Sequence, residues 1–124
     1  MLVATAATFS REQRLLKPRE FGRVFARPVR SADRYFTVLG RPNSCDNPRL
    51  GLAISKRVDK RAVERNRIKR LTREAFRTCD DLPCWDFVVL ARRDAKGAEN
   101  RVLRESLHQH FTRLMSRAQS TRHE

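Results

Sequence analysis

The sequence contains few of the residues from which metal centres and disulfide frameworks are built. Its 124 residues include 3 Cys and 3 His. The cysteines, at positions 45, 79 and 84, are odd in number and form no Cys-x-x-Cys pair, and His108 and His110 do not complete a zinc set with them. We therefore expect free thiols in a reducing compartment and no zinc site, and we name no metal-ligating residue; the sequence does not say whether the protein binds a metal ion of its own.

Long apolar runs and a targeting signal are also missing. No segment approaches the roughly 20 apolar residues that cross a bilayer. Residues 1–9 are mildly apolar, but they lack a cationic stretch and are too short for a signal peptide with its cleavage site. These absences predict a soluble, cytoplasmic protein with no membrane partner.

Carboxylates are scarce and scattered, with 14 Asp and Glu against 28 Lys and Arg. A metal-dependent nuclease needs clustered carboxylates to hold Mg²⁺. The adjacent pair Asp80 and Asp81 follows a predicted helix end, where a solvated turn explains it. His108 and His110 are two residues apart on a predicted helix, so they face different directions. No Gly-rich phosphate loop and no Ser/His/Asp grouping can be placed, so we expect no catalytic residue in the protein itself.

What the sequence has in excess is positive charge, with a formal net charge of +14. By count, 23 of the 28 basic residues are Arg. Arg makes forked hydrogen bonds to phosphate and stacks on bases, which Lys does less well. The composition therefore predicts a polyanionic partner, with folded RNA favoured over an anionic membrane surface or an acidic protein.

The length allows one domain, which we place at residues 10–116 between a flexible N-terminal arm (1–9) and a disordered polar tail (117–124). Periodicity, turn residues and prolines predict helices at 18–27, 60–78 and 100–115, and strands at 29–34, 34–40, 50–58 and 87–91. This α-β-β-β-α-β-α order predicts an α+β fold, in which helices are layered on a small, mostly antiparallel sheet.

The helix at 60–78 is the most distinctive stretch, because residues 55–77 hold ten Lys and Arg against three acids. At about 100° per residue, Ile68, Leu71 and Ala75 share one side. The opposite side carries Asn66, Lys69, Arg70, Arg73 and Arg77. A solvated charged face is the ordinary interpretation of such a pattern, but solvated faces mix signs and this arc has no carboxylate. We therefore favour a polyanion-binding face.

Two further features leave alternatives open. Phe21 and Phe25 are either core residues or an aromatic wall on which unstacked bases lie. The strand at 50–58 alternates large residues with the small face formed by Gly51, Ala53 and Ser55. That small face either packs closely under a helix or forms a trough for a sugar-phosphate chain, with Lys56 and Arg57 at its end.

Two blocks, RLGLAISKR at 49–57 and AVERNRIKRLTREAF at 62–76, closely resemble the signature of the bacterial ribonuclease P protein subunit. The triplet at 65–67 followed by Lys69 and Arg70 is that family's hallmark. Shorter blocks support the register: Arg14-Leu15, Phe21-x-x-Val24-Phe25, the strand from Asp86 with Ala-Arg-Arg after it, and Asn100-Arg101. The resemblance spans residues 11–115.

This resemblance implies a two-layer αβ sandwich like domain 2 of ribosomal protein S5, with a left-handed βαβ crossover around the basic helix, against the usual hand. It also implies a ribonucleoprotein that removes the 5′ leader from precursor tRNA. In that family the RNA subunit carries the Mg²⁺-dependent hydrolysis and holds most of the Mg²⁺. The protein binds the RNA subunit and the leader, and no protein partner is required.

The resemblance also assigns roles to individual residues. Those expected to meet the RNA subunit are Arg65, Asn66, Arg67, Lys69, Arg70 and Arg73. Those expected to line the leader cleft are Phe21, Phe25, Tyr35, Ser55, Lys56 and Arg57. Some relatives carry an aromatic residue where Leu39 stands, so which of Tyr35, Phe36 and Leu39 reaches the leader stays open. Arg67 projects to a flank of the helix and either contacts RNA, which we favour, or pairs with Glu74.

Two other functions compete with this interpretation. A structural RNA-binding protein of the ribosomal type, with no processing role, fits the charge and the fold but not the ordered blocks. A protein-only nuclease is disfavoured because no carboxylate cluster is present.

Overall fold

The computed structural model of the chain describes residues 14, 17–44 and 46–122. The expected N-terminal arm, residues 1–9, and Cys45 lie outside these residues. Cys79 and Cys84 are free thiols, as expected.

A four-stranded mixed sheet forms the centre of the molecule, in the order β1-β2-β4-β3. Its strands are β1 (Val29–Ala32), β2 (Phe36–Pro42), β3 (Arg49–Ala53) and β4 (Trp85–Ala91). β2 pairs with both β1 and β4 in antiparallel fashion, whereas β3 and β4 pair in parallel. Parallel neighbours need a crossover connection. The connection from β3 to β4 contains the basic helix. The family resemblance implies that this crossover is left-handed.

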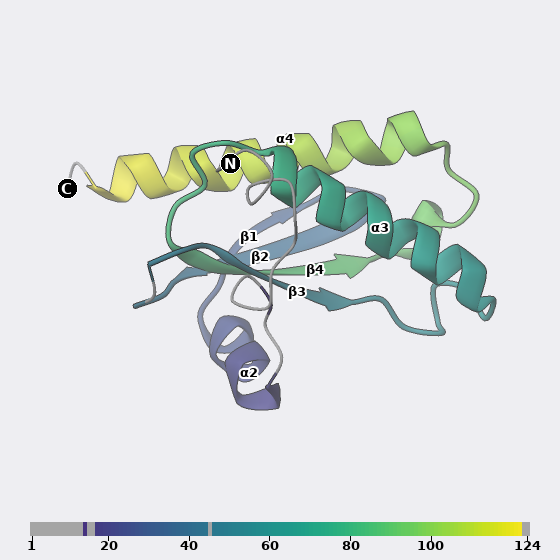
Figure 1. Cartoon of the computed structure of the whole chain (residues 1–124), viewed down its shortest axis with the longest axis horizontal. Helices are drawn as coiled ribbons and strands as arrows, with labels where there is room; N and C mark the ends of the chain where they lie inside the picture. The colour runs from purple at the N-terminus through teal and green to yellow at the C-terminus, as the bar shows by residue number, and fades with distance from the viewer. Residues whose placement is uncertain (1–13, 15–16, 45, 123–124) are drawn as a thin grey trace, which may run out of the picture.

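Three helices flank the sheet: α2 (Pro18–Ala26), α3 (Ala62–Thr78) and α4 (Asn100–Arg122). Figure 1 shows α3 and α4 on one face of the sheet and α2 on the other. A short 3₁₀ turn, η2 (Arg93–Ala95), lies between β4 and α4. The element order confirms the predicted α+β fold.

The main core fills the space between the sheet and the α3–α4 layer. Phe87 of β4 meets Phe76 of α3 and Phe111 of α4 edge to face, at centroid separations of 6.3 and 5.7 Å. All three rings are buried. Such pairs add a preferred geometry to the burial of a large apolar area, so they fix how both helices sit on the sheet.

A smaller cluster lies on the other face, where Val24 of α2 packs with Leu39 and Val88 of the sheet. Phe21 and Ala53 pack against this cluster and are partly buried. One member of the predicted small-residue face, Ala53, thus lies beside α2, which supports the close-packing interpretation for this residue. Ser55 lies beyond the strand and is exposed.

Two predicted boundaries were wrong by about five residues or more. β3 ends at Ala53 and not at Val58, because residues 55–57 turn, with the Val58 N–H donating to the Ser55 carbonyl at 3.1 Å. Ile54 and Val58 are nevertheless buried in the main core, so a loop continues the strand-like apolar pattern. At the C-terminus, α4 continues to Arg122, so residues 117–122 are helical where we expected disorder. Ala118 packs against the main core, which favours this extension.

Candidate RNA interface

The cationic face of α3 is the first part of the candidate interface. Ile68, Leu71 and Phe76 are buried and seat the helix on the core, as the helical period predicts. Asn66 and Arg70 are exposed on the other side, and Lys69 and Arg73 are partly exposed. Within the part of the chain that the structure describes, none of these four side chains has a hydrogen-bond or ion-pair partner. Their polar groups are therefore available to a ligand.

Arg65 has a different environment from this group. Its guanidinium donates to the backbone carbonyls of Asp59 and Lys60, at 3.0 and 2.8 Å. These carbonyls belong to the loop that precedes α3, so Arg65 holds the loop against the first turns of the helix. The side chain keeps part of its surface exposed.

Arg67 is engaged inside the protein. Its Nε donates to Glu64 at 2.7 Å, and a terminal nitrogen donates to Oδ1 of Asn100, at the start of α4, at 2.6 Å. The anticipated alternative partner, Glu74, pairs instead with Arg104 at 3.5 Å. Arg67 therefore ties α3 to α4, and a minor part of its surface stays exposed.

The loop at 54–61 is held by Asp59. Its buried carboxylate accepts hydrogen bonds from the Arg61 backbone N–H at 2.8 Å and from the Arg61 guanidinium at 2.9 and 3.2 Å. These bonds, with the nearby charges of Arg61 and Lys96, lower the pKa of Asp59 to about 2. The ionised Asp59 carboxylate thus holds the loop in place, while Lys56, Arg57 and Lys60 of the same loop are exposed.

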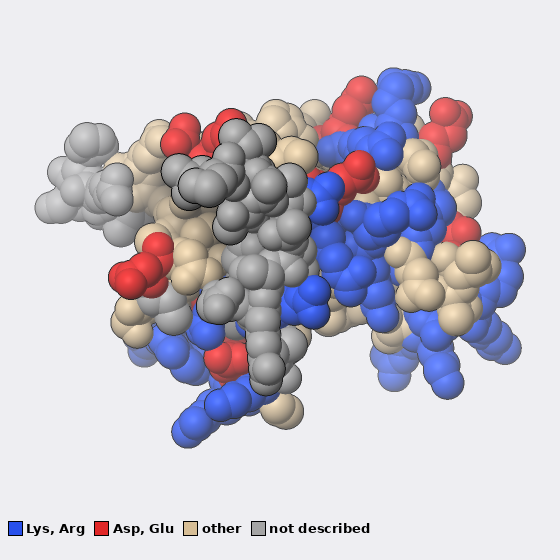
Figure 2. All heavy atoms as spheres, viewed as in Figure 1, with Lys and Arg blue, Asp and Glu red and all other residues tan. Residues whose placement is uncertain are grey.

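Two neighbouring hollows surround this loop, of about 450 and 620 Å³. The first brings Ser55 and Arg57 together with Arg34, Arg92 and Arg93. The second is lined by Lys56, Arg57, Val58, Asp59, Lys60, Arg61, Arg93 and Lys96. Figure 2 shows the resulting concentration of Lys and Arg on the side of the molecule where Figure 1 places the N-terminal part of α3.

The contributions of Arg34, Arg93 and Lys96 were missed by sequence reasoning. The Ala-Arg-Arg block after β4 was used only to support the register of the resemblance. The signal that could have found them is topological. β3 and β4 are parallel neighbours, so the segments that follow them meet at one edge of the sheet.

The aromatic candidates are divided by the structure. Phe25 is 47% exposed, which rules out the core interpretation for this ring. Phe21 is partly buried against the cluster under α2. Phe36 is fully buried in the main core and Leu39 is buried beneath α2, so neither presents a surface. Tyr35 is partly exposed, with the Arg34 guanidinium 5.5 Å from its ring centroid.

A chain of ion pairs holds α2 against the sheet. The Glu20 carboxylate accepts from the Lys17 backbone N–H at 3.0 Å and from Arg49 at 2.8 Å. Arg49 also donates two bonds of 2.8 Å to Asp86, to which Asn43 donates a third. Because Phe21 follows Glu20 directly, this network fixes the position of the aromatic side of α2.

One grouping contradicts the sequence analysis. Ser31, Asp33 and His110 come together, although no Ser/His/Asp grouping could be placed from the sequence. Ser31 Oγ lies 2.7 Å from Nδ1 of His110, whose Nε2 lies 3.2 Å from Asp33. Ser31 and His110 are buried, so the group ties α4 to the β1–β2 turn and presents no nucleophile to a substrate.

Burial and hydrogen bonding set the charges in this group. Burial lowers the pKa of His110, although Asp33 opposes the shift. For Asp33, burial acts to raise the pKa. Hydrogen bonds from Ser106, the Phe36 and Tyr35 backbone N–H groups and His110 outweigh that effect and lower it to about 2. His110 is therefore neutral and Asp33 ionised at neutral pH.

Among the described residues, no three His, Cys, Asp or Glu side chains converge into a possible metal site.

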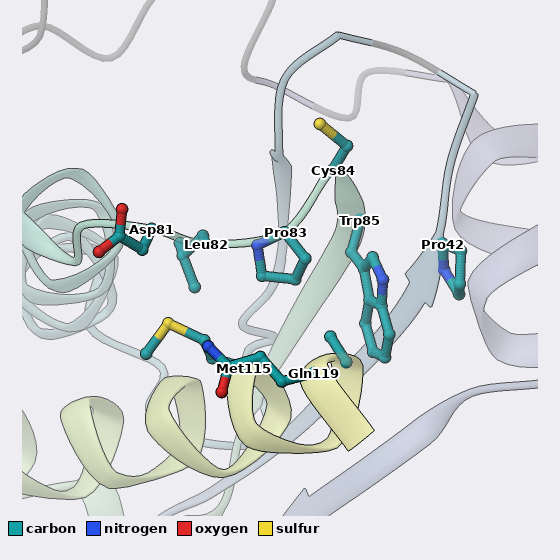
Figure 3. Close-up of a pocket in the computed structure, with 9 residues that line it drawn as sticks. Pro42, Asp81, Leu82, Pro83, Cys84, Trp85, Met115 and Gln119 are labelled. Atoms are coloured by element: carbon teal, nitrogen blue, oxygen red, sulfur yellow. The ribbon is translucent and has the colours of Figure 1, made fainter. Parts of the chain in front are cut away.

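An apolar pocket of about 610 Å³ lies between the start of β4 and the end of α4, with Leu82, Trp85 and Met115 around it (Figure 3). No Lys or Arg lines this pocket, so it does not belong to the cationic surface. None of the described helices combines the length and apolar character needed to span a bilayer.

Comparisons with known proteins identify relatives of this chain. Residues 9–115 match the model of the family described as Ribonuclease P. The ribonuclease P protein component of Photorhabdus laumondii is 52% identical over 100 residues, covering 80% of this chain and 84% of the relative. That of Klebsiella pneumoniae is also 52% identical, with the same coverage.

Solved structures give the same result. The RNase P protein of Staphylococcus aureus superimposes with a TM-score of 0.76 at 32% identity, covering 81% of this chain and 93% of that one. The RNase P protein of Thermotoga maritima gives a TM-score of 0.69 at 29% identity, covering 84% and 96%.

Proposed function

The chain belongs to the ribonuclease P protein family, and we propose that it binds the RNA subunit of that ribonucleoprotein together with the 5′ leader of precursor tRNA. Family membership makes it the protein component of an endoribonuclease of tRNA processing. The proposal assigns each surface of the protein to one of these two RNAs.

The observation that carries the proposal is the cationic face of α3. A face with three cations, no carboxylate and no internal partner among the described residues favours a dense polyanion, because its cations release the counterions condensed on the phosphates. We assign Asn66, Lys69, Arg70 and Arg73 to direct contact with the RNA subunit. Arg65 and Arg67 flank this group and contribute through the surface that their internal hydrogen bonds leave exposed.

The leader is assigned to the opposite face of the sheet and the adjoining loop. The exposed ring of Phe25 and the partly exposed ring of Phe21 offer stacking surfaces to unpaired bases on that face. Tyr35 packs against the main core instead, and its partly exposed ring, beside Arg34, offers a third stacking surface next to the hollow that Arg34 and Ser55 line. Ser55, Lys56 and Arg57 are exposed at the end of the small-residue face, where they offer a hydroxyl and two cations to the backbone. This combination of stacking and charge suits single-stranded RNA of any sequence.

Hydrolysis itself is assigned to the RNA subunit, which holds most of the Mg²⁺. The chain contributes by binding: it holds leader and RNA subunit on one rigid scaffold, which raises the effective concentration of substrate. It requires no protein partner and works in the cytoplasm.

Reconstituted cleavage tests the proposal. Precursor tRNA is incubated with the chain alone, with a bacterial ribonuclease P RNA subunit alone at low Mg²⁺, and with both. We expect removal of the leader to be strongest with both and absent with the chain alone. Cleavage by the chain alone would revive the protein-only nuclease. RNA binding without stimulation of cleavage would favour the structural RNA-binding alternative.

A further inference from the structure

A second cationic surface lies on α2, outside every set of residues assigned above. Arg19, Arg23 and Arg27 follow one another at intervals of four residues, and all three side chains are exposed. At about 100° per residue they share an arc of roughly 80° along the helix and its first following residue. We call these three residues the outer stripe of α2.

The outer stripe points away from the aromatic side of the same helix. On the helical projection its centre lies about 180° from the midpoint between Phe21 and Phe25, with the buried Val24 between the two sides. Figure 2 shows blue side chains at the lower edge of the molecule, where Figure 1 places α2, apart from the larger blue area over α3. RNA stacked on the phenylalanines therefore cannot account for the stripe.

Nothing in the described chain neutralises the outer stripe. The one carboxylate on α2, Glu20, is already bound by Arg49 at 2.8 Å and by the Lys17 backbone N–H at 3.0 Å. Arg41 donates a hydrogen bond to the Arg23 carbonyl, at 2.6 Å, and brings another positive charge to this helix. Among the described residues, none of the three stripe guanidinium groups has an ion-pair or hydrogen-bond partner.

Part of this arrangement works against the stability of the isolated helix, although the helix dipole favours Arg23 in the last turn. Like charges four residues apart repel along a helix. Arg19 stands in the first turn, where the helix dipole disfavours a cation. A bound polyanion would relieve both effects. The stripe arc also contains no large apolar side chain, and the exposed ring of Phe25 lies on the opposite side of the helix, so the stripe itself brings no apolar group to a membrane surface.

We propose that the outer stripe of α2 binds the phosphate backbone of a second RNA segment, distinct from the one against Phe21 and Phe25. The inference rests on the proposed function, because the second segment belongs to the same ribonucleoprotein, either its RNA subunit or its precursor tRNA. Arginine at each position provides a forked donor that matches phosphate geometry. α2 thus lies between two RNA segments, one on each side.

The test uses the full chain with Arg19→Gln, Arg23→Gln and Arg27→Gln combined. Affinity is measured at several salt concentrations in two arms: for the RNA subunit alone, and for precursor tRNA by the assembled ribonucleoprotein. Three lost phosphate contacts should reduce the log-log salt slope by about two to three units in one arm. Loss in the first arm assigns the second segment to the RNA subunit, and loss only in the second assigns it to precursor tRNA.

A matched control removes three exposed arginines from α4, by Arg101→Gln, Arg104→Gln and Arg113→Gln. Both triple variants carry the same net charge, and melting curves check that both fold. If the stripe triple variant does not fold, the single variant Arg23→Gln replaces it, with an expected reduction of about one unit in the log-log salt slope. An unchanged slope in both arms, or an equal loss in the control, overturns the inference. If the unsubstituted chain itself shows no salt-dependent affinity for RNA, the proposed function fails first.

Discussion

Arg49 and Asp86 face each other across β3 and β4, and two nitrogens of the Arg49 guanidinium each donate a 2.8 Å hydrogen bond to a different oxygen of Asp86. The side chain of Asp86 is 4% exposed and that of Arg49 is 16% exposed. A third nitrogen of Arg49 reaches Glu20 on α2. One side chain thus joins two strands to the helix that carries the aromatic side of the proposed cleft.

Removal of Arg49 should therefore destabilise the fold. Arg49→Met leaves the buried Asp86 carboxylate without its ionic partner, which typically costs about 3–5 kcal/mol in the free energy of unfolding. Urea denaturation measures the change. Replacing the pair together, by Arg49→Met with Asp86→Leu, should cost less than Arg49→Met alone. Equal losses in the two variants would show that the ion pair is not what holds this region.

Gly40 should tolerate no side chain. A Cβ atom at this position would lie 2.9 Å from Cε3 of the buried Trp85 and 3.3 Å from the ring of Phe87. Gly40→Ala should therefore cost about 1–3 kcal/mol by overpacking the core. Gly22→Ala is the matched control, because its Cβ would meet nothing within 4 Å and alanine favours a helix by about 0.5–1 kcal/mol. Thermal denaturation should move in opposite directions for the two variants.

Phe25 should matter for binding and little for folding. Its ring is 47% exposed, so Phe25→Ala should leave the free energy of unfolding nearly unchanged. The same variant should weaken leader binding by about 1–3 kcal/mol, the contribution of one base stacked on an aromatic ring. The fully buried Phe111 is the control, since Phe111→Ala should cost about 3–5 kcal/mol of stability. A Phe25→Ala variant that melts early and binds the leader normally would reverse this assignment.

The free energy of unfolding should fall as the pH drops below about 6.5. The pKa of His110 is lowered in the folded chain, so the unfolded chain takes up a proton at His110 first, at its ordinary pKa of about 6.5. Asp33, with a pKa of about 2 in the folded chain, adds a further loss below about pH 4. Urea denaturation between pH 5 and 7.5 isolates the histidine contribution.

Substitution separates this contribution from the rest of the protein. His110→Gln should flatten the rise in unfolding free energy between pH 5 and 7, whatever its effect on absolute stability. His108→Gln is the control, because His108 is exposed on the same helix and lies outside the group formed by Ser31, Asp33 and His110. A rise that is the same in His110→Gln and in the unsubstituted chain would mean that His110 is not its source.

What the sequence could predict was local. The helical period separated Ile68 and Leu71 from the cations of α3. Pro18 and Pro28 marked the limits of α2. Both predictions succeeded because a helical face and a helix end depend on residues within a turn or two of one another. The apolar alternation also found β3, but it overran the strand end, since Ile54 and Val58 are buried from a loop.

The contacts that could not be predicted join residues far apart in the chain. Arg67 pairs with Asn100 across 33 positions, and Ser31 meets His110 across 79. Their partners are decided by how α3 and α4 pack on the sheet, which no local pattern encodes. The same reason explains why Arg34 and Arg93 were missed beside Ser55 and Arg57.

The central claim is that the cationic face of α3 holds RNA, and its salt dependence tests this most directly. Affinity for a ribonuclease P RNA subunit is measured across several salt concentrations for the unsubstituted chain and for a variant with Lys69→Gln, Arg70→Gln and Arg73→Gln. The α4 triple variant serves again as the control for net charge. We predict a log-log slope smaller by about two to three units for the α3 variant, roughly one for each cation, and a smaller change for the control. An α3 variant with the slope and affinity of the unsubstituted chain would contradict the account.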